Sequence, residues 1–156
     1  MTAGVSHSMH KILIILVIIC TTLSLQAQNS TSNFKLSDYS NKIVYVDFWA
    51  SWCIPCRKSF PWMNEMQEKY KDKGLIIIAI NMDEDKDDAK KFLKKYPSKF
   101  KVIYDDGTLA EKYKVKGMPY SILFDKNGEI TNTHIGFKLK ESKDYEQVFI
   151  KNLGVK

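Results

Sequence analysis

The chain has 156 residues, enough for one domain with a hydrophobic core and too few for two domains of ordinary size. Its composition, 44% hydrophobic and 27% charged, is that of a globular protein and excludes a disordered chain or a fibrous repeat. The net charge is +6, but acidic residues are interleaved with the lysines and arginine occurs once, at Arg57, which argues against a nucleic-acid-binding surface.

The N-terminal segment has the layout of an export signal. A basic start precedes an unbroken apolar run at residues 12–20, and small and polar residues follow as far as Ala27. We therefore predict that residues 1–27 are a signal peptide and that the protein is exported to the periplasm or another extracytoplasmic compartment. A retained membrane anchor is the alternative, although a spanning helix needs about 20 apolar residues. Residues 28–33 are predicted to be a polar tether, and residues 34–156 one folded domain.

Buried strands and a helix are predicted in the first half of this domain. Residues 43–50 are β-branched and aromatic, and residues 75–83 form a continuous apolar run, as in strands that are covered on both faces. Between them, apolar residues recur at helical spacing from Cys53 onwards, and Gly74 is predicted to cap the helix.

The second half continues the alternation of helices and strands. Residues 84–96 begin with acidic residues and end with lysines, as the helix dipole favours. A short strand is predicted at residues 99–105 and a short helix at 107–115. Residues 120–136 are predicted to form a hairpin around Asp-Lys-Asn-Gly, and a final helix is predicted from about residue 140 to 153. The order β-α-β-α-β-α-β-β-α predicts an α/β fold: a mixed central sheet with parallel strands in the middle, antiparallel strands at the edges and helices on both faces.

Two cysteines, Cys53 and Cys56, follow the N-terminal segment, and they admit three readings. A zinc site would need four ligands, and His134 is the one histidine downstream of residue 27, so we predict no metal. A purely structural disulfide that closes so small a loop would stabilise the fold little. Thiol-disulfide exchange is the reading that we favour.

The position of the pair is the reason. The segment WCIPC lies where a strand passes into a helix, so Cys53 is predicted at the helix N-terminus, where unpaired N–H groups and the helix dipole favour a thiolate. Pro55 fits the first turn, which does not use its missing N–H. Cys56 is expected to lie deeper, which would give an exposed attacking sulfur on Cys53 and a resolving sulfur on Cys56.

At this point the chain resembles a known family. The segment VDFWASWCIPCRKSFPWM is similar to the active-site segment of thioredoxin-fold proteins, most closely the exported TlpA/ResA-like thiol-disulfide oxidoreductases. FKLSDYSNK resembles the lead-in of that group, IAINMDEDKDDAKKFLKKYPSKFKVIYD its extra helix-strand segment, and YKVKGMPYSILFDKNGEI its cis-proline strand and hairpin. The resemblance covers residues 34–137. It implies a thioredoxin-like fold with an extra central helix-strand segment.

The resemblance also implies roles for single residues. Pro119 matches the cis-proline of the family, and the backbone of Met118 would pair with an extended substrate. Asp47 matches the buried acid that takes up and returns the proton of Cys56, and burial would raise its pKa. Thioredoxin has a lysine on the neighbouring strand, whereas the matching position here is apolar, near Ala79.

Other positions near the cysteines are expected to bind substrate or to support the helix. Trp52, Ile54 and Pro55 are predicted substrate contacts. Ser59 stands where ResA-like proteins often have Glu, so no role of that Glu is transferred to this chain. Pro61 matches the proline that bends the helix in this family. Trp49 and Trp62 are expected to pack in the core.

Together these features predict an exported thiol-disulfide oxidoreductase that reduces disulfides of protein substrates. The Ile-Pro pair between the cysteines adds no positive charge, which argues against a strong oxidant. The predicted redox group is the Cys53–Cys56 disulfide itself, with no other cofactor. The expected partners are protein thiols and disulfides and a membrane thiol-disulfide electron donor, and the resemblance allows a role in cytochrome c maturation. A monomer is expected. The alternatives are a disulfide oxidase or isomerase, and a non-catalytic peptide-binding module.

Overall fold

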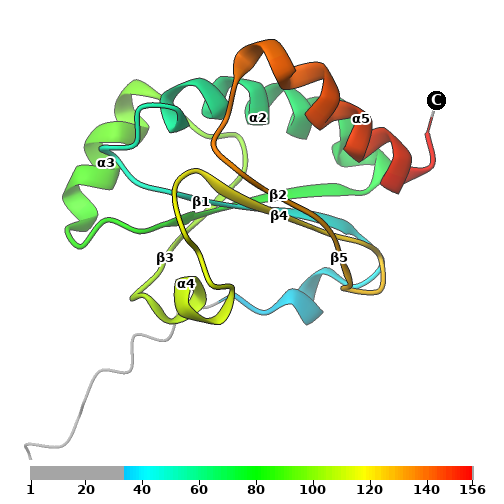
Figure 1. Cartoon of the computed structure of the whole chain (residues 1–156), viewed down its shortest axis with the longest axis horizontal. Coiled ribbons are helices and arrows are strands. Elements are labelled where there is room, and N and C mark those ends of the chain that lie inside the picture. Colours follow the sequence, from blue (N-terminus) through cyan, green and yellow to red (C-terminus); the bar gives the residue numbers. More distant parts are fainter. Residues whose placement is uncertain (1–33, 156) are drawn as a thin grey trace, which may run out of the picture. The chain divides into compact units, whose positions relative to one another are not determined.

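The computed structural model describes residues 34–155. The predicted signal peptide, residues 1–27, and the predicted tether, residues 28–33, lie outside this part of the chain. Five strands form one mixed sheet (Figure 1). Along the chain these strands are β1 (Ile43–Trp49), β2 (Leu75–Asn81), β3 (Lys101–Tyr104), β4 (Tyr120–Phe124) and β5 (Ile130–Ile135).

The sheet has the order β3-β2-β1-β4-β5, with β1 at its centre. β1 runs parallel to β2 and antiparallel to β4, and its residue Asp47 is in register with Ala79 on one side and Ser121 on the other. β2 and β3 are parallel, and β4 and β5 form an antiparallel hairpin. The mixed sheet is confirmed, but the prediction of parallel strands flanked by antiparallel edges was wrong. The hairpin adds to one side of β1, so the parallel strands form one half of the sheet and β5 alone is an antiparallel edge.

Helices cover both faces of the sheet, as predicted. In Figure 1, α2, α3 and α5 lie on one face, and α4 and the 3-10 helix η1 (Leu36–Tyr39) lie on the other. The α-helices in the described part of the chain are α2 (Cys56–Tyr70), α3 (Lys86–Lys95), α4 (Thr108–Lys112) and α5 (Ser142–Leu153). Two further 3-10 turns, η2 (Lys71–Lys73) and η3 (Leu139–Glu141), follow α2 and precede α5. None of the helices in residues 34–155 is long and apolar enough to cross a membrane.

Local sequence explains where the helices begin and end. Asp85 caps α3, because its side chain accepts the backbone N–H of Asp87 at 2.8 Å. Gly74 ends the α2–η2 segment at φ 100°, a left-handed conformation that glycine adopts without strain. The predicted helix from Cys53 starts three residues later, at Cys56, because the Cys-Ile-Pro segment forms a turn.

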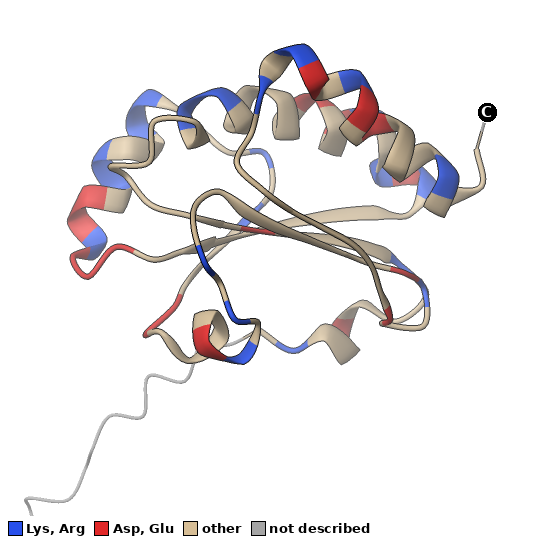
Figure 2. Cartoon of the chain, in the orientation of Figure 1, with Lys and Arg blue, Asp and Glu red and all other residues tan. Residues whose placement is uncertain are grey.

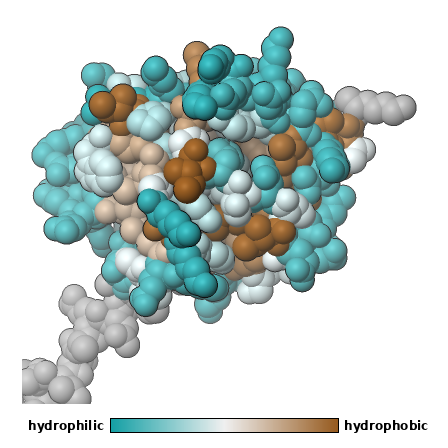
Figure 3. Space-filling view, in the orientation of Figure 1, coloured by the Kyte–Doolittle hydropathy of each residue, from teal (hydrophilic) through white to brown (hydrophobic). Residues whose placement is uncertain are grey.

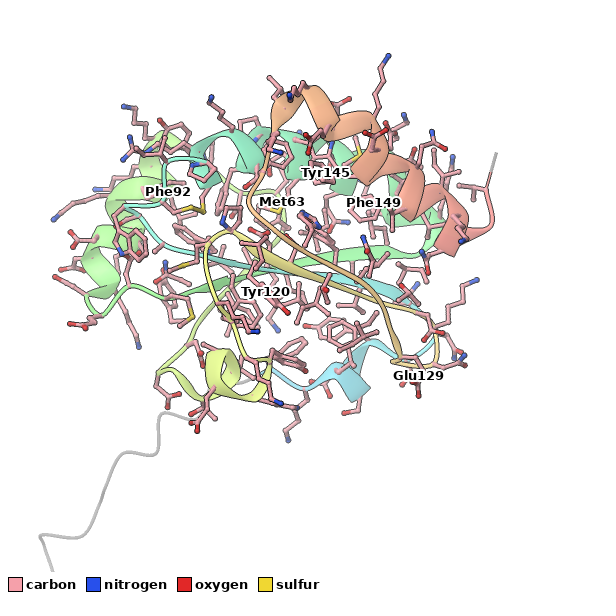
Figure 4. All side chains as sticks on the ribbon, viewed as in Figure 1. Met63, Phe92, Tyr120, Glu129, Tyr145 and Phe149 are labelled. Carbon is pink, nitrogen blue, oxygen red and sulfur yellow. A yellow bond between two sulfur atoms is a disulfide. The ribbon has the colours of Figure 1, made fainter. Side chains whose placement is uncertain are left out.

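The alternation of β1 divides the hydrophobic core into two layers. Tyr45 and Trp49 pack on the face that α2, α3 and α5 cover, whereas Val46 and Phe48 pack on the face of α4 and η1. Figure 4 shows Met63 of α2 and Tyr145 and Phe149 of α5 on the first of these faces. Asp47 alternates with Val46 and Phe48, so its side chain is on the same face as helix α2. The surface seen in Figure 3 is mostly hydrophilic, with separate hydrophobic patches.

Candidate active site

The two cysteines form a disulfide at the junction between β1 and α2. Their Cα atoms are 5.3 Å apart. The N–H of Cys53 donates to the carbonyl of Ala50 at 3.1 Å, which holds the turn after β1. The N–H of Cys56, the first residue of α2, donates to Sγ of Cys53 at 3.3 Å. An N–H that points at a sulfur favours the charged form of that sulfur, which is the contact that the predicted thiolate form of Cys53 would use.

Pro55 occupies the N-cap position of α2 rather than the first helical position. Its φ of −64° suits the helix, and its carbonyl accepts the N–H groups of Lys58 at 3.0 Å and Ser59 at 3.1 Å. Cys53 therefore lies before the helix, and its sulfur contacts the first turn from outside. Cys53 itself is not helical, and the effect of the helix start on its thiolate stays a prediction.

The exposure of the pair differs from the prediction. Cys56 is fully buried and Cys53 is 3% exposed, so Cys53 is the more accessible of the two but is not an exposed residue. The side chains on either side of it point outwards instead, since Trp52 is 64% and Ile54 65% exposed. The sulfur of Cys53 thus packs with the core of the α2 face. The spacing of residues along the chain could not predict that the side chain of Cys53 points into the core.

Asp47 is buried below α2 with one hydrogen-bond partner. Ser121 of β4 donates its hydroxyl to Oδ1 of Asp47 at 2.6 Å, and within residues 34–155 Oδ2 has no partner. Burial raises the pKa of Asp47 to about 7, against the smaller lowering effect of the Ser121 hydrogen bond. The register partner on β2 is Ala79, so the apolar neighbour that we predicted in place of a lysine is confirmed. This carboxyl group can therefore change its charge near neutral pH.

The Met118–Pro119 bond is cis, as predicted. Pro119 is buried, and its carbonyl accepts the N–H of Gly136 at 2.7 Å. Met118 is half-buried and packs against the cluster that contains both cysteines. A Cβ atom at Gly117 would lie 3.3 Å from Cγ2 of Ile135, so the segment before β4 runs close to the end of β5.

Sequence reasoning missed a polar clamp beside the cysteines, formed by Ser51, Asn81 and Asp83. The backbone N–H of Ser51 donates to both carboxylate oxygens of Asp83, at 3.1 and 2.9 Å, and the Ser51 hydroxyl donates to Oδ1 at 2.8 Å. Asn81 donates to Oδ2 at 2.8 Å. The clamp joins the turn before Cys53 to the loop after β2. The sequence signal that could have indicated the clamp is Asn-Met-Asp at the carboxyl end of a buried strand. The carboxyl ends of parallel strands meet at one edge of a sheet, so these polar side chains come close to the turn that follows β1.

The other residues singled out from the sequence have structural surroundings. Ser59 is buried and donates its hydroxyl to the carbonyl of Cys56 at 3.2 Å. Pro61 lies inside α2, which continues past it. Trp49 is fully buried, as predicted, and Trp62 packs against Phe149 with ring centroids 5.6 Å apart, which confirms its packing role.

The part of the chain that the structure describes holds no group of three or more histidine, cysteine or acidic side chains able to bind a metal. His134 stacks on Tyr145, with ring centroids 4.7 Å apart, and burial lowers its pKa. The absence of a metal and of an organic cofactor remains a prediction from the sequence.

Comparison with known proteins places the chain in a family. The family model described as Redoxin matches residues 20–149. The chain belongs to the Redoxin family. It is 44% identical over 108 residues to a thiol-disulfide oxidoreductase ResA of Bacillus cereus, covering 69% of this chain and 62% of the relative. This Redoxin chain therefore spans less than two thirds of the length of the curated relatives that it matches.

Solved structures agree with this assignment. A protein of Chlorobium tepidum, provisionally described as the thiol:disulfide interchange protein DsbE, is 47% identical to this Redoxin chain, with a TM-score of 0.76 over 80% of this chain and 91% of that one. A thiol:disulfide interchange protein from Bacteroides sp. is 28% identical, with a TM-score of 0.65 over 76% and 78% of the two chains. The predicted thioredoxin-like fold and the resemblance to ResA-like proteins are confirmed.

Proposed function

We propose that this protein is a thiol-disulfide oxidoreductase that reduces disulfides of protein substrates. The Cys53 thiolate attacks one sulfur of the substrate disulfide, forms a mixed disulfide and releases one substrate thiol. Cys56 then attacks Cys53, releases the second substrate thiol and closes the Cys53–Cys56 disulfide. Two electrons and two protons pass to the substrate. The observation that carries the proposal is the hydrogen bond from the N–H of Cys56 to Sγ of Cys53 at the start of α2.

Asp47 is the proposed proton acceptor for Cys56. Its side chain points toward the face that α2 covers, and its pKa of about 7 lies closer to that of an ordinary thiol, about 8.5, than the pKa of an exposed aspartate does. A base with such a pKa takes a proton at neutral pH and returns it at little cost. Ser121 would hold the carboxyl group in place through its 2.6 Å hydrogen bond.

The proposed substrate contacts surround the cysteines on the outer side. Trp52 and Ile54 offer exposed apolar surface on the same turn as Cys53, with Pro55 beside them. On the other side, the Met118–Pro119 segment would pair with an extended substrate as an added strand. The carbonyl of Pro119 already accepts the N–H of Gly136, so the backbone of Met118 is the free partner that we propose for the substrate.

The direction of the reaction and the location of the protein rest on the sequence. The Ile-Pro pair between the cysteines supports a reductase rather than a strong oxidant. The signal-like N-terminal segment supports export, or anchoring by residues 12–25, and a reductase outside the cytoplasm needs electrons from a membrane thiol-disulfide donor. The proposed partners are therefore that donor and proteins with oxidised cysteine pairs.

A stoichiometric reduction assay tests the proposal. The domain from residue 28 onwards, reduced and freed of reductant, is mixed with a peptide that contains one internal disulfide, and free peptide thiols are counted by mass after alkylation. We expect one peptide disulfide reduced for each domain oxidised, and no reduction by the Cys53→Ser variant at equal folded content. Peptide binding without reduction by the parent domain would instead identify a non-catalytic binding module.

A further inference from the structure

A groove of about 320 Å³ lies beside the cysteine turn, between the start of α2 and helix α3. Its volume is at the lower end of the range for small-ligand sites, roughly 300–1,000 Å³. We call it the basic groove, and the residues of its rim that matter here are Ser51, Arg57, Asp88, Lys91, Lys95 and Tyr96. Ser51 precedes Cys53 by two residues and Arg57 follows Cys56 directly, so the lining of the groove includes residues from both sides of the cysteine turn along the chain.

The charges around the basic groove are mostly positive. Figure 2 shows Lys and Arg residues on the start of α2 and on the C-terminal half of α3, with acidic residues gathered at the other end of α3. Lys91 is neutralised by Asp88, with Nζ and Oδ1 2.9 Å apart. Arg57 and Lys95 form no ion pair within residues 34–155. The groove therefore presents two cations without an anionic partner, next to the positive end of the α2 dipole.

Hydrogen bonds hold the backbone on both sides of the basic groove. Asn64 of α2 donates to the carbonyl of Pro97 at 2.7 Å and accepts the N–H of Lys99 at 2.7 Å, which ties α2 to the chain leaving α3. At the other end, Asp83 holds Ser51 through the polar clamp. The fold thus holds the backbone of the groove in place, while the cationic side chains of its rim are exposed.

The floor of the basic groove is aromatic and continuous with the core below the disulfide. Phe92, labelled in Figure 4, packs on Trp49 with ring centroids 4.7 Å apart and on Tyr96 at 4.8 Å. Lys95 places Nζ 5.7 Å from the centroid of the Tyr96 ring. An occupant of the groove would thus have its methylene groups against aromatic rings and its charged end between Arg57 and Lys95.

We propose that the basic groove binds an acidic side chain, glutamate or aspartate, of the protein substrate whose disulfide Cys53 attacks. The inference rests on the proposed function, because the groove acts through the substrate that the cysteines reduce. Because the lining residues Ser51 and Arg57 flank the cysteine turn and an extended chain advances about 3.3 Å per residue, we expect the acidic residue within a few positions of the substrate cysteine. The groove selects substrates with acidic residues beside their disulfide over neutral or basic ones.

Two matched peptides test the proposal. Both contain one internal disulfide, and they differ only in carrying glutamates or glutamines two to four residues from each cysteine. With the reduced domain at low salt, we expect the second-order rate constant of peptide reduction to be about fivefold higher for the glutamate peptide, as one or two exposed ion pairs would give. The advantage should shrink toward unity in 0.5 M salt. Equal values for the two peptides at low salt would overturn the inference, whereas failure to reduce either peptide would overturn the proposed function and the inference with it.

Charge-matched variants locate the effect. In the double variant Arg57→Gln with Lys95→Gln, we expect the ratio of the second-order rate constants for the two peptides to fall close to one, and the ratio cancels any change in the reactivity of Cys53. The control is Lys42→Gln with Lys126→Gln, which removes the same charge at the opposite end of β1, where the N–H of Asn41 donates to the carbonyl of Lys126. The control should keep the parent ratio. A ratio retained in the first variant, or lost in the control, would place the selection elsewhere.

Discussion

The two sides of the Cys53–Cys56 disulfide differ in almost every physical respect. On the inner side, Asp47 is buried under α2 with a single hydroxyl partner, and Trp49 is fully buried in the same core layer. On the outer side, Trp52 is exposed, and two cations of the basic groove, Arg57 and Lys95, form no ion pair with the described residues. The difference suggests a division of labour. Changes on the inner side should alter the stability of the protein and should slow proton transfer equally for all substrates. Changes on the outer side should alter which substrates are reduced.

The largest effect on the reaction is expected from replacing Cys56. Replacing Cys56 with serine leaves Cys53 able to attack but removes the group that resolves the mixed disulfide. We expect the release of fully reduced substrate to slow on the order of 10³-fold or more, while a covalent adduct between Cys53 and the substrate accumulates. Mass spectrometry under non-reducing conditions measures the adduct. Complete reduction of the substrate without an adduct would show that Cys56 is not the resolving cysteine.

The next effect concerns Asp47 and the pH dependence of stability. The pKa of Asp47 is raised from 3.8 to about 7 in the folded state by burial, so the folded protein binds this proton more tightly than the unfolded chain does. Its contribution to stability is complete below about pH 4 and is lost as the pH rises through about 7. Asp47→Asn cannot ionise, and its oxygen still accepts the Ser121 hydroxyl. The variant should gain stability over the parent across this window, by about 4 kcal/mol at most.

Denaturant unfolding at pH 4, 6 and 8 measures this difference, and a constant difference across the series would contradict the raised pKa. The same variant should reduce every disulfide peptide more slowly near pH 7, about 10²-fold, because it can no longer accept the proton of Cys56. The loss should be equal for the glutamate and glutamine peptides. A loss confined to one peptide would place Asp47 on the substrate-selecting side.

A smaller effect is expected from the polar clamp. Asp83→Ala leaves the Ser51 N–H and hydroxyl and the Asn81 amide without their acceptor, which should cost about 1–3 kcal/mol of the free energy of unfolding. It should also change the rate of disulfide exchange, because Ser51 holds the turn before Cys53. Denaturant unfolding and the peptide assay measure the two effects.

The matched control for the clamp is Asp125→Ala. Asp125 accepts the N–H groups of Asn127 and Glu129, both at 2.8 Å, in the turn between β4 and β5. We expect this variant to lose stability and keep the parent exchange rate. If both variants alter exchange equally, the clamp acts only through stability and does not position the cysteine turn.

The smallest effect belongs to Trp52. Because its side chain is exposed, Trp52→Ala should change the free energy of unfolding by no more than about 0.5 kcal/mol. In single turnover with excess peptide, we expect the peptide concentration that gives half the maximal rate to rise a few-fold, with little change in the maximal rate, since an apolar contact to the bound substrate is removed. Trp49→Ala, in the core, should instead cost about 3–5 kcal/mol. Unchanged kinetics for Trp52→Ala would exclude it from substrate binding.

Within residues 34–155, the sequence predicted the order of the strands and α-helices because each has a local signal, whereas the short 3-10 helices were not predicted. The continuous apolar run of β2 and the dipole-matched charges of α3 are examples. The cis bond was predicted from the Gly-Met-Pro segment through the family resemblance. The position of the hairpin could not be derived in this way, because side-by-side placement of β1 and β4 depends on packing between distant segments.

The site shows the same limit. The spacing of Cys53 and Cys56 indicated exchange, but the burial of Cys53 depends on the direction of its side chain within the turn. Ser51 and Asp83 are separated by 32 residues, and Arg57 and Lys95 stand on different helices. These groups come together only once α2 and α3 pack on the same face of the sheet.

The equilibrium reduction potential of the Cys53–Cys56 pair tests the proposed reductase most directly. The domain from residue 28 onwards is titrated against a thiol-disulfide buffer, and its oxidised fraction is measured at each ratio. We expect a value of roughly −270 to −230 mV, near that of thioredoxin, which would let the dithiol reduce protein disulfides. A value near roughly −120 mV would contradict this and make the protein a disulfide donor.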